Sequence, residues 1–348
     1  MIDVDVAVIG AGQAGLSSGY FLRRAGLEHV ILDAGQGPGG AWQHRWPTLR
    51  MATVHGIHDL PDMPFEVVDE TAPANEVLPA YFADFERRND LTVLRPSTVD
   101  AVRYGDDRRL LVETKDETWA ARALINATGT WTRPFWPRYP GQELFRGRQL
   151  HTANYVGPEE FAGQHVVVVG GGSSAIQLQL EIAQHATVTW VTRRPPVFRD
   201  EPFSQEWGRA AVAKVEEAVR EGRPPASVVS VTDLAVTPAV RAAREAGLLV
   251  RQPMFDHLTS DGVVWADGRF ERVDAILWAT GFRAALDHLA PLHLRGPGGG
   301  IKIEGTRVVD EPRVHLVGYG PSASTIGANR AGRIAVREIK QLLRPALV

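Results

Sequence analysis

Two glycine-rich segments, at residues 10–15 and 170–175, have the spacing of turns that hold nucleotide phosphates. The first, Gly-Ala-Gly-Gln-Ala-Gly, follows the apolar run Val4 to Ile9, and the second, Gly-Gly-Gly-Ser-Ser-Ala, follows the run His165 to Val169. In such a turn the first glycine permits a sharp exit from a strand and the second lets the backbone approach a pyrophosphate. The third position, glycine or alanine, lets helix and strand pack closely. Because a helix start favours anions, both segments are predicted to bind a dinucleotide.

The residue at the end of the next strand differs between the two units. Asp33 stands eighteen positions after Gly15, whereas the same count from Ala175 leads to Arg193, with Arg194 beside it. A carboxylate accepts hydrogen bonds from ribose hydroxyls and repels a 2′-phosphate, while a guanidinium group binds that phosphate. The contrast predicts FAD at the first site and NADPH, rather than NADH, at the second. The alternative is that both arginines are only exposed surface charges.

The strands and helices that must position these turns can be outlined from the same pattern. Continuous Val/Ile runs are typical of strands buried on both faces of a parallel sheet, and helical stretches follow both glycine turns, with further strands at His29 to Leu32 and Thr187 to Val191. Two more apolar runs end in Ala-Thr-Gly, at 127–129 and 279–281, a feature that marks domain crossings in flavoproteins with two dinucleotide sites. The expected last strand is His315 to Gly318, and the closing helix is Ser324 to Leu343.

We therefore expect an α/β protein with two Rossmann-like dinucleotide-binding domains, the second inserted in the first. Residues 1–160 and 283–348 are expected to form the FAD-binding domain, and residues 161–282 the NAD(P)H-binding domain. The inserted domain also contains two helical segments, Ser204 to Glu221 and Thr237 to Ala246. The first of them is either a cap over the active site or a solvent-facing insertion.

Composition excludes several kinds of chemistry. The 348 residues contain no cysteine, so the chain has no redox-active thiol pair or thiolate metal site, and its net charge of −3 gives no basic surplus for nucleic acid or an acidic membrane. The sequence also contains no convincing Ser/His/Asp set, metal-ligand cluster or pair of catalytic carboxylates. With no signal peptide and no apolar run of about 18 residues, a cytoplasmic enzyme is expected. The sequence leaves its oligomeric state, including a homodimer, open.

Residues 145–155 read Phe-x-Gly-x-x-x-His-x-x-x-Tyr, just before the second glycine turn. This segment resembles the fingerprint of the flavin-containing monooxygenases, which are class B flavoprotein monooxygenases. Related Baeyer–Villiger enzymes have Trp followed by Pro or Asp at its end, whereas this chain has Tyr155 and Val156. The closer resemblance is thus to members that oxygenate nitrogen and sulfur.

The resemblance extends over nearly the whole chain. The Gly-Gly-x-Trp segment at 39–42 resembles one that lies near the flavin in the family, and residues 318–327 resemble the strand-to-helix turn of small bacterial members, where a helix start faces the flavin. Two departures stand out. Tyr319 replaces the usual Asp of that turn, and residues 51–55 lack the Asn that in many members steadies the oxygen adduct.

Together, the motifs and the resemblance predict two sets of cofactor contacts. Those expected for FAD are Gly10, Gly12, Gln13, Ala14, Gly15, Asp33, Ala34, Gly40, Trp42, Thr128, Gly129, Gly318, Thr325 and Ile326. Those expected for NADP are Gly170, Gly172, Ser173, Ser174, Ala175, Arg193, Arg194, Ala279, Thr280 and Gly281. No residue is assigned as catalytic. His151 and Arg50 are candidates for positioning roles, the alternatives being a structural histidine at a domain junction and a surface ion pair.

The resemblance implies a reaction as well. NADPH would reduce the flavin, the reduced flavin would form a C4a-hydroperoxide with O2, and a sulfide or amine substrate would take the distal oxygen. Three alternatives remain open at this stage. They are Baeyer–Villiger oxygenation of a ketone, an NADPH oxidase or flavin-dependent reductase, and, outside the enzymes, a redox-sensing nucleotide-binding protein.

Overall fold

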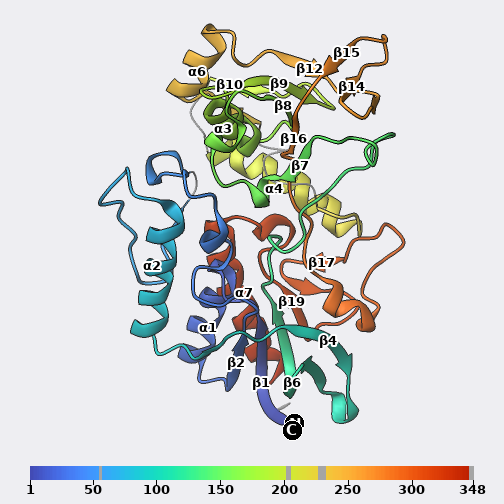
Figure 1. The fold of residues 1–348 in the computed structure, drawn as a ribbon. Helices are drawn as coiled ribbons and strands as arrows, with labels where there is room; N and C mark the ends of the chain where they lie inside the picture. The colour runs from blue at the N-terminus through green and yellow to red at the C-terminus, as the bar shows by residue number, and fades with distance from the viewer. Residues whose placement is uncertain (55–56, 201–204, 226–232, 345–348) are drawn as a thin grey trace.

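The computed structural model describes residues 1–54, 57–200, 205–225 and 233–344. The chain forms two lobes, each built around a sheet, which lie at the bottom and the top of Figure 1. The N- and C-terminal parts of the chain meet in the first lobe, and the middle of the chain forms the second. This arrangement agrees with the α/β class and with an inserted second unit.

The first lobe contains a sheet with the order β17-β18-β19-β6-β1-β2-β3, and β4 and β5 form an antiparallel extension on β6. The pairs β1/β2, β1/β6, β2/β3 and β6/β19 are parallel. Its strands are β1 (Ile2–Ile9), β2 (His29–Leu32), β3 (Val93–Leu94), β4 (Val99–Tyr104), β5 (Leu110–Thr114), β6 (Thr118–Asn126), β17 (Ile303–Glu304), β18 (Arg307–Val308) and β19 (Val314–Leu316).

The second lobe contains a parallel sheet with the order β12-β9-β8-β16-β7. Its strands are β7 (Arg148–His151), β8 (His165–Val169), β9 (Thr187–Thr192), β12 (Arg251–Pro253) and β16 (Ala275–Trp278). Both sheets follow one plan, because the strand before each glycine turn lies between the next strand of its unit and a strand that ends in Ala-Thr-Gly. Two small sheets in the same lobe pair β10 (Phe198–Arg199) with β11 (Leu234–Ala235), and β13 (His257–Leu258) with β14 (Gly262–Val264) and β15 (Phe270–Arg272).

Helices cover the two sheets. They are α1 (Gln13–Ala25), α2 (Ala74–Arg88), α3 (Ser173–Ile182), α4 (Gln205–Arg220), α6 (Pro238–Glu245) and α7 (Thr325–Leu342), and short 3-10 turns include η1 (Gly40–His44), η2 (Met51–Thr53), η4 (Thr152–Asn154), η6 (Asp287–Leu292) and η7 (Gly320–Ser322). Helices α1 and α7 pack side by side on the first sheet. None of the described helices is long and apolar enough to cross a membrane.

Apolar residues explain why each sheet is buried on both faces. In β1, Val6, Ala7 and Val8 are fully buried; Ala7 and Ile9 belong to one hydrophobic cluster, and Val6 and Val8 belong to another on the opposite face of the sheet. The second sheet has the same arrangement, with Val166 and Val167 of β8 in different clusters. The uninterrupted Val/Ile runs therefore predicted the central strands correctly.

The first predicted domain boundary, at residue 160, falls inside the second lobe. The strand β7 pairs with β16 in the second sheet, and Phe145 belongs to a buried cluster with Val167 of β8. The chain leaves the first sheet earlier, after β6, and returns to it after β16, and these are the two strands that precede the Ala-Thr-Gly segments. The predicted domain boundary at residue 160 is therefore too late, because the fingerprint segment contributes β7 as an edge strand of the second sheet.

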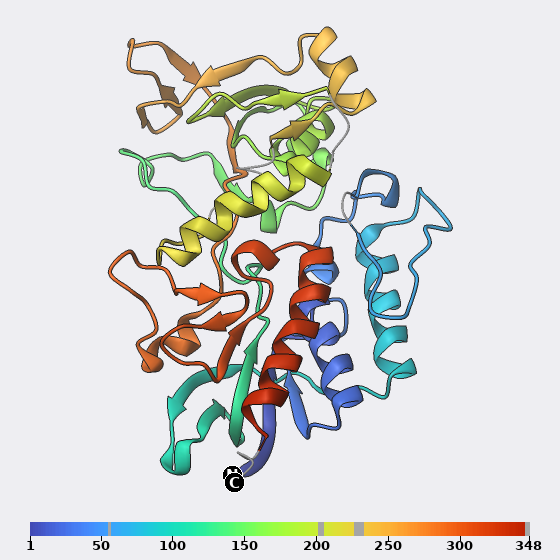
Figure 2. The same cartoon turned by 180° about the vertical axis from the view of Figure 1, so that it is seen from behind.

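The helical insertion α4 lies between the two lobes, as Figure 2 shows from behind. Its Val215, Ala218 and Val219 are buried, and Val219 belongs to a hydrophobic cluster of the first lobe. The helix packs against η7 and β17. The C-terminal half of α4 is therefore not a solvent-facing insertion but a contact between the lobes. Residue 204, the predicted first residue of this helix, lies outside the described part of the chain.

Candidate cofactor and active site

The first glycine turn leaves the C-terminal end of β1 and starts α1. Gly10 has a φ of 97°, and a Cβ there would lie 2.5 Å from the carbonyl oxygen of Ala127. A Cβ on Gly15 would collide with the carbonyl oxygen of Gly10. By contrast, the space beside Gly12 is open, with the nearest heavy atom, the Cα of Gly40, at 4.0 Å. No side chain caps the start of α1, so the turn fits a pyrophosphate group.

Two other predicted FAD residues hold neighbouring segments against this turn. The side-chain nitrogen of Gln13 donates to Oδ1 of Asn329 on α7 at 3.0 Å, and it also reaches the carbonyl oxygens of His58 and Asp59. A Cβ added to Gly318 would lie 3.5 Å from the Cβ of Ala14 on α1, so the two residues are in contact distance. The strand-to-helix turn after β19 is thereby brought to the same edge of the sheet. Thr325 and Ile326 begin α7, but their side chains lie outside what the structure describes.

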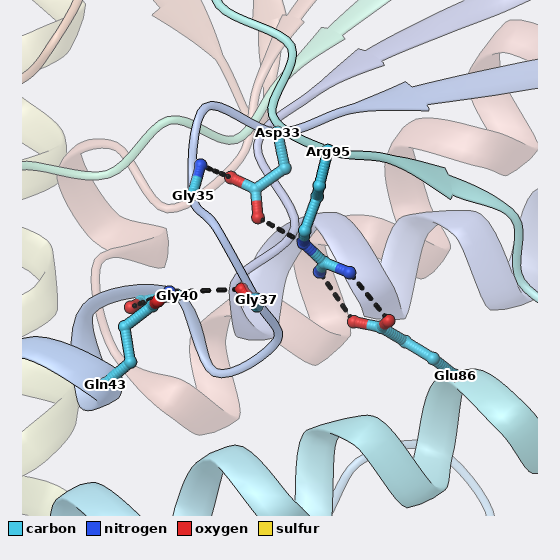
Figure 3. Close-up of polar contacts among 7 residues, drawn as sticks. All are labelled: Asp33, Gly35, Gly37, Gly40, Gln43, Glu86 and Arg95. Atoms are coloured by element: carbon cyan, nitrogen blue, oxygen red, sulfur yellow. Dashed lines mark hydrogen bonds and ion pairs between the residues drawn. The ribbon is translucent and has the colours of Figure 1, made fainter.

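Asp33 lies at the end of β2, where it is part of a buried ion-pair network (Figure 3). Nε of Arg95 donates to Asp33 at 2.9 Å, and both terminal nitrogens of Arg95 donate to the carboxylate of Glu86 on α2. All three side chains are at most 14% exposed. Burial lowers the pKa of Arg95, but its bonds to Glu86 and Asp33 more than offset this and raise it. Arg95 thus fixes the Asp33 carboxylate, and no motif in the sequence pointed to this arginine. Ala34, the next residue after Asp33, is exposed.

The loop that carries the Gly-Gly-x-Trp segment folds over the first turn. A Cβ on Gly40 would lie 2.8 Å from the Cα of Gly12, so the two backbones are in close contact. The side chain of Gln43 donates to the carbonyl oxygens of Gly37 and Gly40 and keeps the loop compact (Figure 3). Trp42 is half-buried and packs against both main clusters that flank this loop.

The second glycine turn repeats the geometry of the first at the end of β8. Gly170 has a φ of 146°, and a Cβ there would collide with the carbonyl oxygen of Ala279. Helix α3 begins after Gly172 without a side-chain cap. Ala175 is fully buried, while Ser173 and Ser174, which are also predicted to contact the nucleotide, are partly exposed at the helix start. This turn also fits a pyrophosphate group.

The charge at the end of β9 is opposite to that at the end of β2. Arg193 and Arg194 are exposed, and the ion pairs nearby join other residues, Arg199 with Asp233 and Arg241 with Asp200. A third cation, Arg251 of β12, donates from Nε to the hydroxyl of Thr192 at 2.8 Å. Sequence spacing could not reveal Arg251, because parallel pairing of β12 with β9 brings it there.

The two Ala-Thr-Gly ends hold the segments that connect the lobes. Thr128 Oγ1 donates to the carbonyl oxygen of Ala285 at 2.6 Å, and Thr280 Oγ1 donates to that of Phe135 at 2.5 Å. The N–H of Ala285 bonds to Gly129, and the N–H of Phe135 bonds to Gly281. The two crossing segments, residues 129–135 and 281–285, therefore pair with each other. Each threonine bonds to the segment that follows the other Ala-Thr-Gly end.

His151, the central fingerprint residue, is fully buried at this junction. Its Nε2 donates to the carbonyl oxygen of Gly281 at 3.0 Å, and its Nδ1 accepts from the N–H of Ala153 at 3.1 Å. This bonding requires the neutral ring, and burial lowers the pKa of His151 accordingly. The geometry favours a positioning role. Arg50, the other candidate, is exposed at the start of η2.

The last fingerprint residue, Tyr155, contacts both lobes. Its hydroxyl donates to Oε2 of Glu181 on α3 at 3.1 Å, and the same oxygen accepts from the hydroxyl of Thr48 at 2.7 Å. Burial and the neighbouring Glu181 raise the pKa of Tyr155, so this phenol keeps its proton. Nearby, the side chain of Gln177 donates to the carbonyl oxygen of Thr53.

An aromatic cluster, which the sequence analysis did not identify, fills the junction between the two turns. The ring of Trp131 stacks on His44 with centroids 5.8 Å apart and on Phe282 at 5.0 Å. Phe282 in turn makes an edge contact with His151. Trp131 follows the first Ala-Thr-Gly segment by two residues, and Phe282 follows the second directly. This position beside the two motifs is the sequence feature that could have identified the cluster.

Comparisons with known proteins agree with this geometry. The family described as pyridine nucleotide-disulphide oxidoreductase matches residues 7–247. The solved structure of a flavin-containing monooxygenase from Stenotrophomonas maltophilia is 39% identical, with a TM-score of 0.85 and coverage of 99% of this chain and 100% of that chain.

Two curated relatives are more distant. An uncharacterized CzcO-like oxidoreductase of Geobacillus kaustophilus is 24% identical over 306 residues, which are 84% of this chain and 87% of the relative. The probable indole-3-pyruvate monooxygenase YUCCA4 of Arabidopsis thaliana is 28% identical over 180 residues, 51% of this chain and 44% of its own length.

The predicted resemblance and the predicted fold class are confirmed by these matches. The matches imply a flavin cofactor and a pyridine nucleotide, and no cysteine is present in the chain for the disulfide chemistry in the family's description. The chain belongs to the pyridine nucleotide-disulphide oxidoreductase family and, within it, is a flavin-dependent monooxygenase.

Proposed function

We propose that this enzyme binds FAD at the first glycine turn and NADPH at the second, and that it oxygenates a small soft nucleophile, a sulfide or an amine. The observation that carries the cofactor assignment is the charge contrast between the ends of β2 and β9. Asp33 is held by Arg95 at the first, whereas Arg193 and Arg194 at the second are exposed and form no ion pair with the described residues. A free guanidinium group beside a ribose site is suited to a 2′-phosphate.

The roles of the chain's own residues follow from the geometry. The starts of α1 and α3 bind the two pyrophosphates, and the paired crossing segments bring the two nucleotides to one junction. The aromatic cluster of Trp131, Phe282 and His44 excludes water from that junction. When bound, the flavin accepts a hydride from the nicotinamide and activates O2. Neutral His151 keeps the second crossing segment in place through Gly281.

The choice of a soft nucleophile rests on two features. The fingerprint ends in Tyr155 and Val156, and oxygen transfer to a sulfide or an amine requires no catalytic acid or base from the chain. The balanced reaction consumes NADPH, a proton, O2 and a sulfide, and it yields NADP+, water and the sulfoxide. The expected cytoplasmic location is part of the same proposal.

An isotope experiment tests this function. Purified holoenzyme is supplied with NADPH, O2 gas enriched in the heavy isotope, and a panel of sulfides, amines and ketones, with hydrogen peroxide measured in parallel. We expect one labelled oxygen atom in the sulfoxide or N-oxide for each NADPH consumed. Labelled ester from a ketone would instead indicate Baeyer–Villiger chemistry, and stoichiometric peroxide with no labelled product would identify an oxidase and overturn the proposal.

A further inference from the structure

Arg45 carries a charge that no described carboxylate balances through an ion pair. Its guanidinium carbon lies 5.3 Å from the ring centroids of both Trp42 and Trp131, so two indole rings contact it. Its Nε atom is buried and has no hydrogen-bond partner among the described residues. Burial alone lowers the pKa of Arg45, with no contribution from a nearby carboxylate.

Such a group is unusual for an arginine that serves only the fold. Burying a guanidinium group costs free energy unless an anion or hydrogen-bond acceptors replace the lost water. Stacking on two tryptophans supplies attraction from the ring faces but leaves the buried Nε–H donor without an acceptor among the described residues. The buried Arg95, by comparison, donates to two carboxylates. Arg45 therefore points to an anion that the described residues do not supply.

The position of Arg45 narrows the identity of this anion. The residue directly follows η1, whose first residue, Gly40, touches Gly12 of the first phosphate-binding turn. Trp131, which also contacts the guanidinium group, belongs to the first crossing segment, two residues after Gly129. The cation thus lies between the loop that covers one nucleotide site and the segment that leads to the other.

We propose that Arg45 is an anion-binding residue that contacts a phosphate group of a bound dinucleotide. Both FAD and NADPH contain a pyrophosphate, and the two sources are separated by measuring each affinity by itself. The inference rests on the proposed binding of FAD and NADPH but not on the identity of the oxygenated substrate. It can therefore fail while the monooxygenase activity stands.

The experiment compares Arg45→Met, Arg45→Lys and wild-type enzyme. Dissociation constants are measured for FAD, by fluorescence quenching in the apoprotein, and for NADP+, by perturbation of the flavin spectrum, at low and high salt. A charged hydrogen bond of about 1.5–3 kcal/mol corresponds to a ten- to hundredfold loss of affinity. We expect this loss for one nucleotide in Arg45→Met, with a weaker dependence on salt and partial recovery in Arg45→Lys.

A matched control removes another stacked arginine. Arg24 lies over the ring of Tyr20 at the far end of α1 from the glycine turn, and Arg24→Met should leave both affinities within about twofold of wild type. If Arg45→Met folds and binds both nucleotides as wild type does, the proposal is wrong. If Arg45→Met does not fold, the affinities and salt dependence of Arg45→Lys decide in the same way.

A separate observation concerns the contact between the lobes. Glu181 lies on α3, the helix whose start forms the second nucleotide site, and it accepts hydrogen bonds from Thr48 of the first lobe and from Tyr155. Gln177, one turn earlier on α3, bonds to the carbonyl oxygen of Thr53. One face of α3 is therefore tied at two points to residues 48–53, which follow the loop over the first turn.

We infer that Glu181 and Tyr155 are positioning residues that set the orientation of the second nucleotide site toward the first. Hydride transfer is sensitive to such placement, because a shift of about 1 Å between reactants can cost about a hundredfold in rate. Removal of the acceptor should therefore slow flavin reduction more than it weakens coenzyme binding.

The test compares Glu181→Leu with Glu181→Gln, in which the amide oxygen can still accept both hydrogen bonds. We expect Glu181→Leu to lower the anaerobic rate of flavin reduction at saturating NADPH about tenfold, with FAD content and the NADPH dissociation constant nearly unchanged. Glu181→Gln should recover most of this rate. An unchanged rate in Glu181→Leu would refute the inference, and so would a loss confined to FAD content or stability.

Discussion

The strand after the first glycine turn ends in Asp33, whereas the corresponding strand after the second ends in Arg193, eighteen residues beyond the same point of the motif. The backbones of the two turns are alike, since Gly10 and Gly170 each lie against the carbonyl oxygen of the alanine in an Ala-Thr-Gly segment. The side chains around them differ. Asp33 is buried in a network with Arg95 and Glu86, while Arg193 is exposed and unpaired among the described ion pairs.

Under the proposed function, this difference adapts one backbone plan to two modes of nucleotide binding. A site that retains its cofactor can bury its charged groups, because they are balanced within the protein. A site that binds and releases a coenzyme in each cycle gains from exposed charges that the ligand itself satisfies. We therefore expect substitutions at the first site to act on stability and flavin retention, and those at the second to act on coenzyme affinity.

The largest expected effect concerns the third position of each turn. In Gly15→Ala the new Cβ would collide with the carbonyl oxygen of Gly10, a backbone atom that cannot move cheaply. We expect destabilisation above the roughly 1–3 kcal/mol of ordinary overpacking, together with loss of FAD. The reciprocal Ala175→Gly should cost only about 1 kcal/mol. Flavin content per chain and urea midpoints measure both, and equal effects would show that the two turns do not differ in packing.

The next effect separates a buried cation from an exposed one. Arg95→Met leaves the carboxylates of Asp33 and Glu86 buried without their partner, which should cost about 3–5 kcal/mol. Arg193→Met should change stability by no more than about 0.5 kcal/mol, because its side chain is exposed. Denaturant unfolding of both variants provides the measurement. A stable Arg95→Met would mean that the network does not hold the first site together.

Coenzyme preference is the next test. Replacing Arg193 and Arg194 together by alanine should raise the KM for NADPH ten- to hundredfold and leave that for NADH nearly unchanged, since only NADPH has the 2′-phosphate. The magnitude corresponds to about 1.5–3 kcal/mol for a lost charged hydrogen bond. Steady-state kinetics with both coenzymes measure it. If the double variant still prefers NADPH to NADH, Arg251, which bonds to Thr192 at the end of β9, would be the residue that binds the 2′-phosphate.

Pattern and spacing sufficed for the parts of the molecule that depend on local sequence. The runs before the glycine turns, the turns themselves and the Asp33/Arg193 contrast are each readable within about thirty residues, as in a single strand–helix–strand unit. Arg95 was not readable, because it is 62 residues from Asp33 and reaches it only through the pairing of β2 with β3. Arg45 and Trp131 meet for a similar reason, across the crossing segment. The boundary at 160 failed because a short edge strand, β7, gives little signal of the sheet it joins.

The smallest effect extends the comparison to the two Ala-Thr-Gly strands. On the first, Nε2 of His288 donates to the side chain of Asn126 at 2.6 Å, and burial lowers the pKa of His288 to about 4. The residue that corresponds to Asn126 at the second Ala-Thr-Gly end is Trp278, and its indole N–H donates to Gln149, which does not titrate. In the unfolded chain the histidine pKa is about 6.5, so on acidification the unfolded state takes up the proton first.

Stability from His288 is therefore complete above pH 6.5 and is lost as the pH falls from 6.5 toward 4. At pH 5.5 the loss should be about 1.4 kcal/mol, one pH unit below the unfolded-state value. His288→Gln keeps a donor for Asn126 but does not titrate, so the difference between wild type and variant isolates this contribution from that of buried His315, whose pKa is also lowered to about 4. Urea unfolding at pH 7 and pH 5.5 measures the difference, and parallel losses in both proteins would show that His288 is not protected from protonation in the fold.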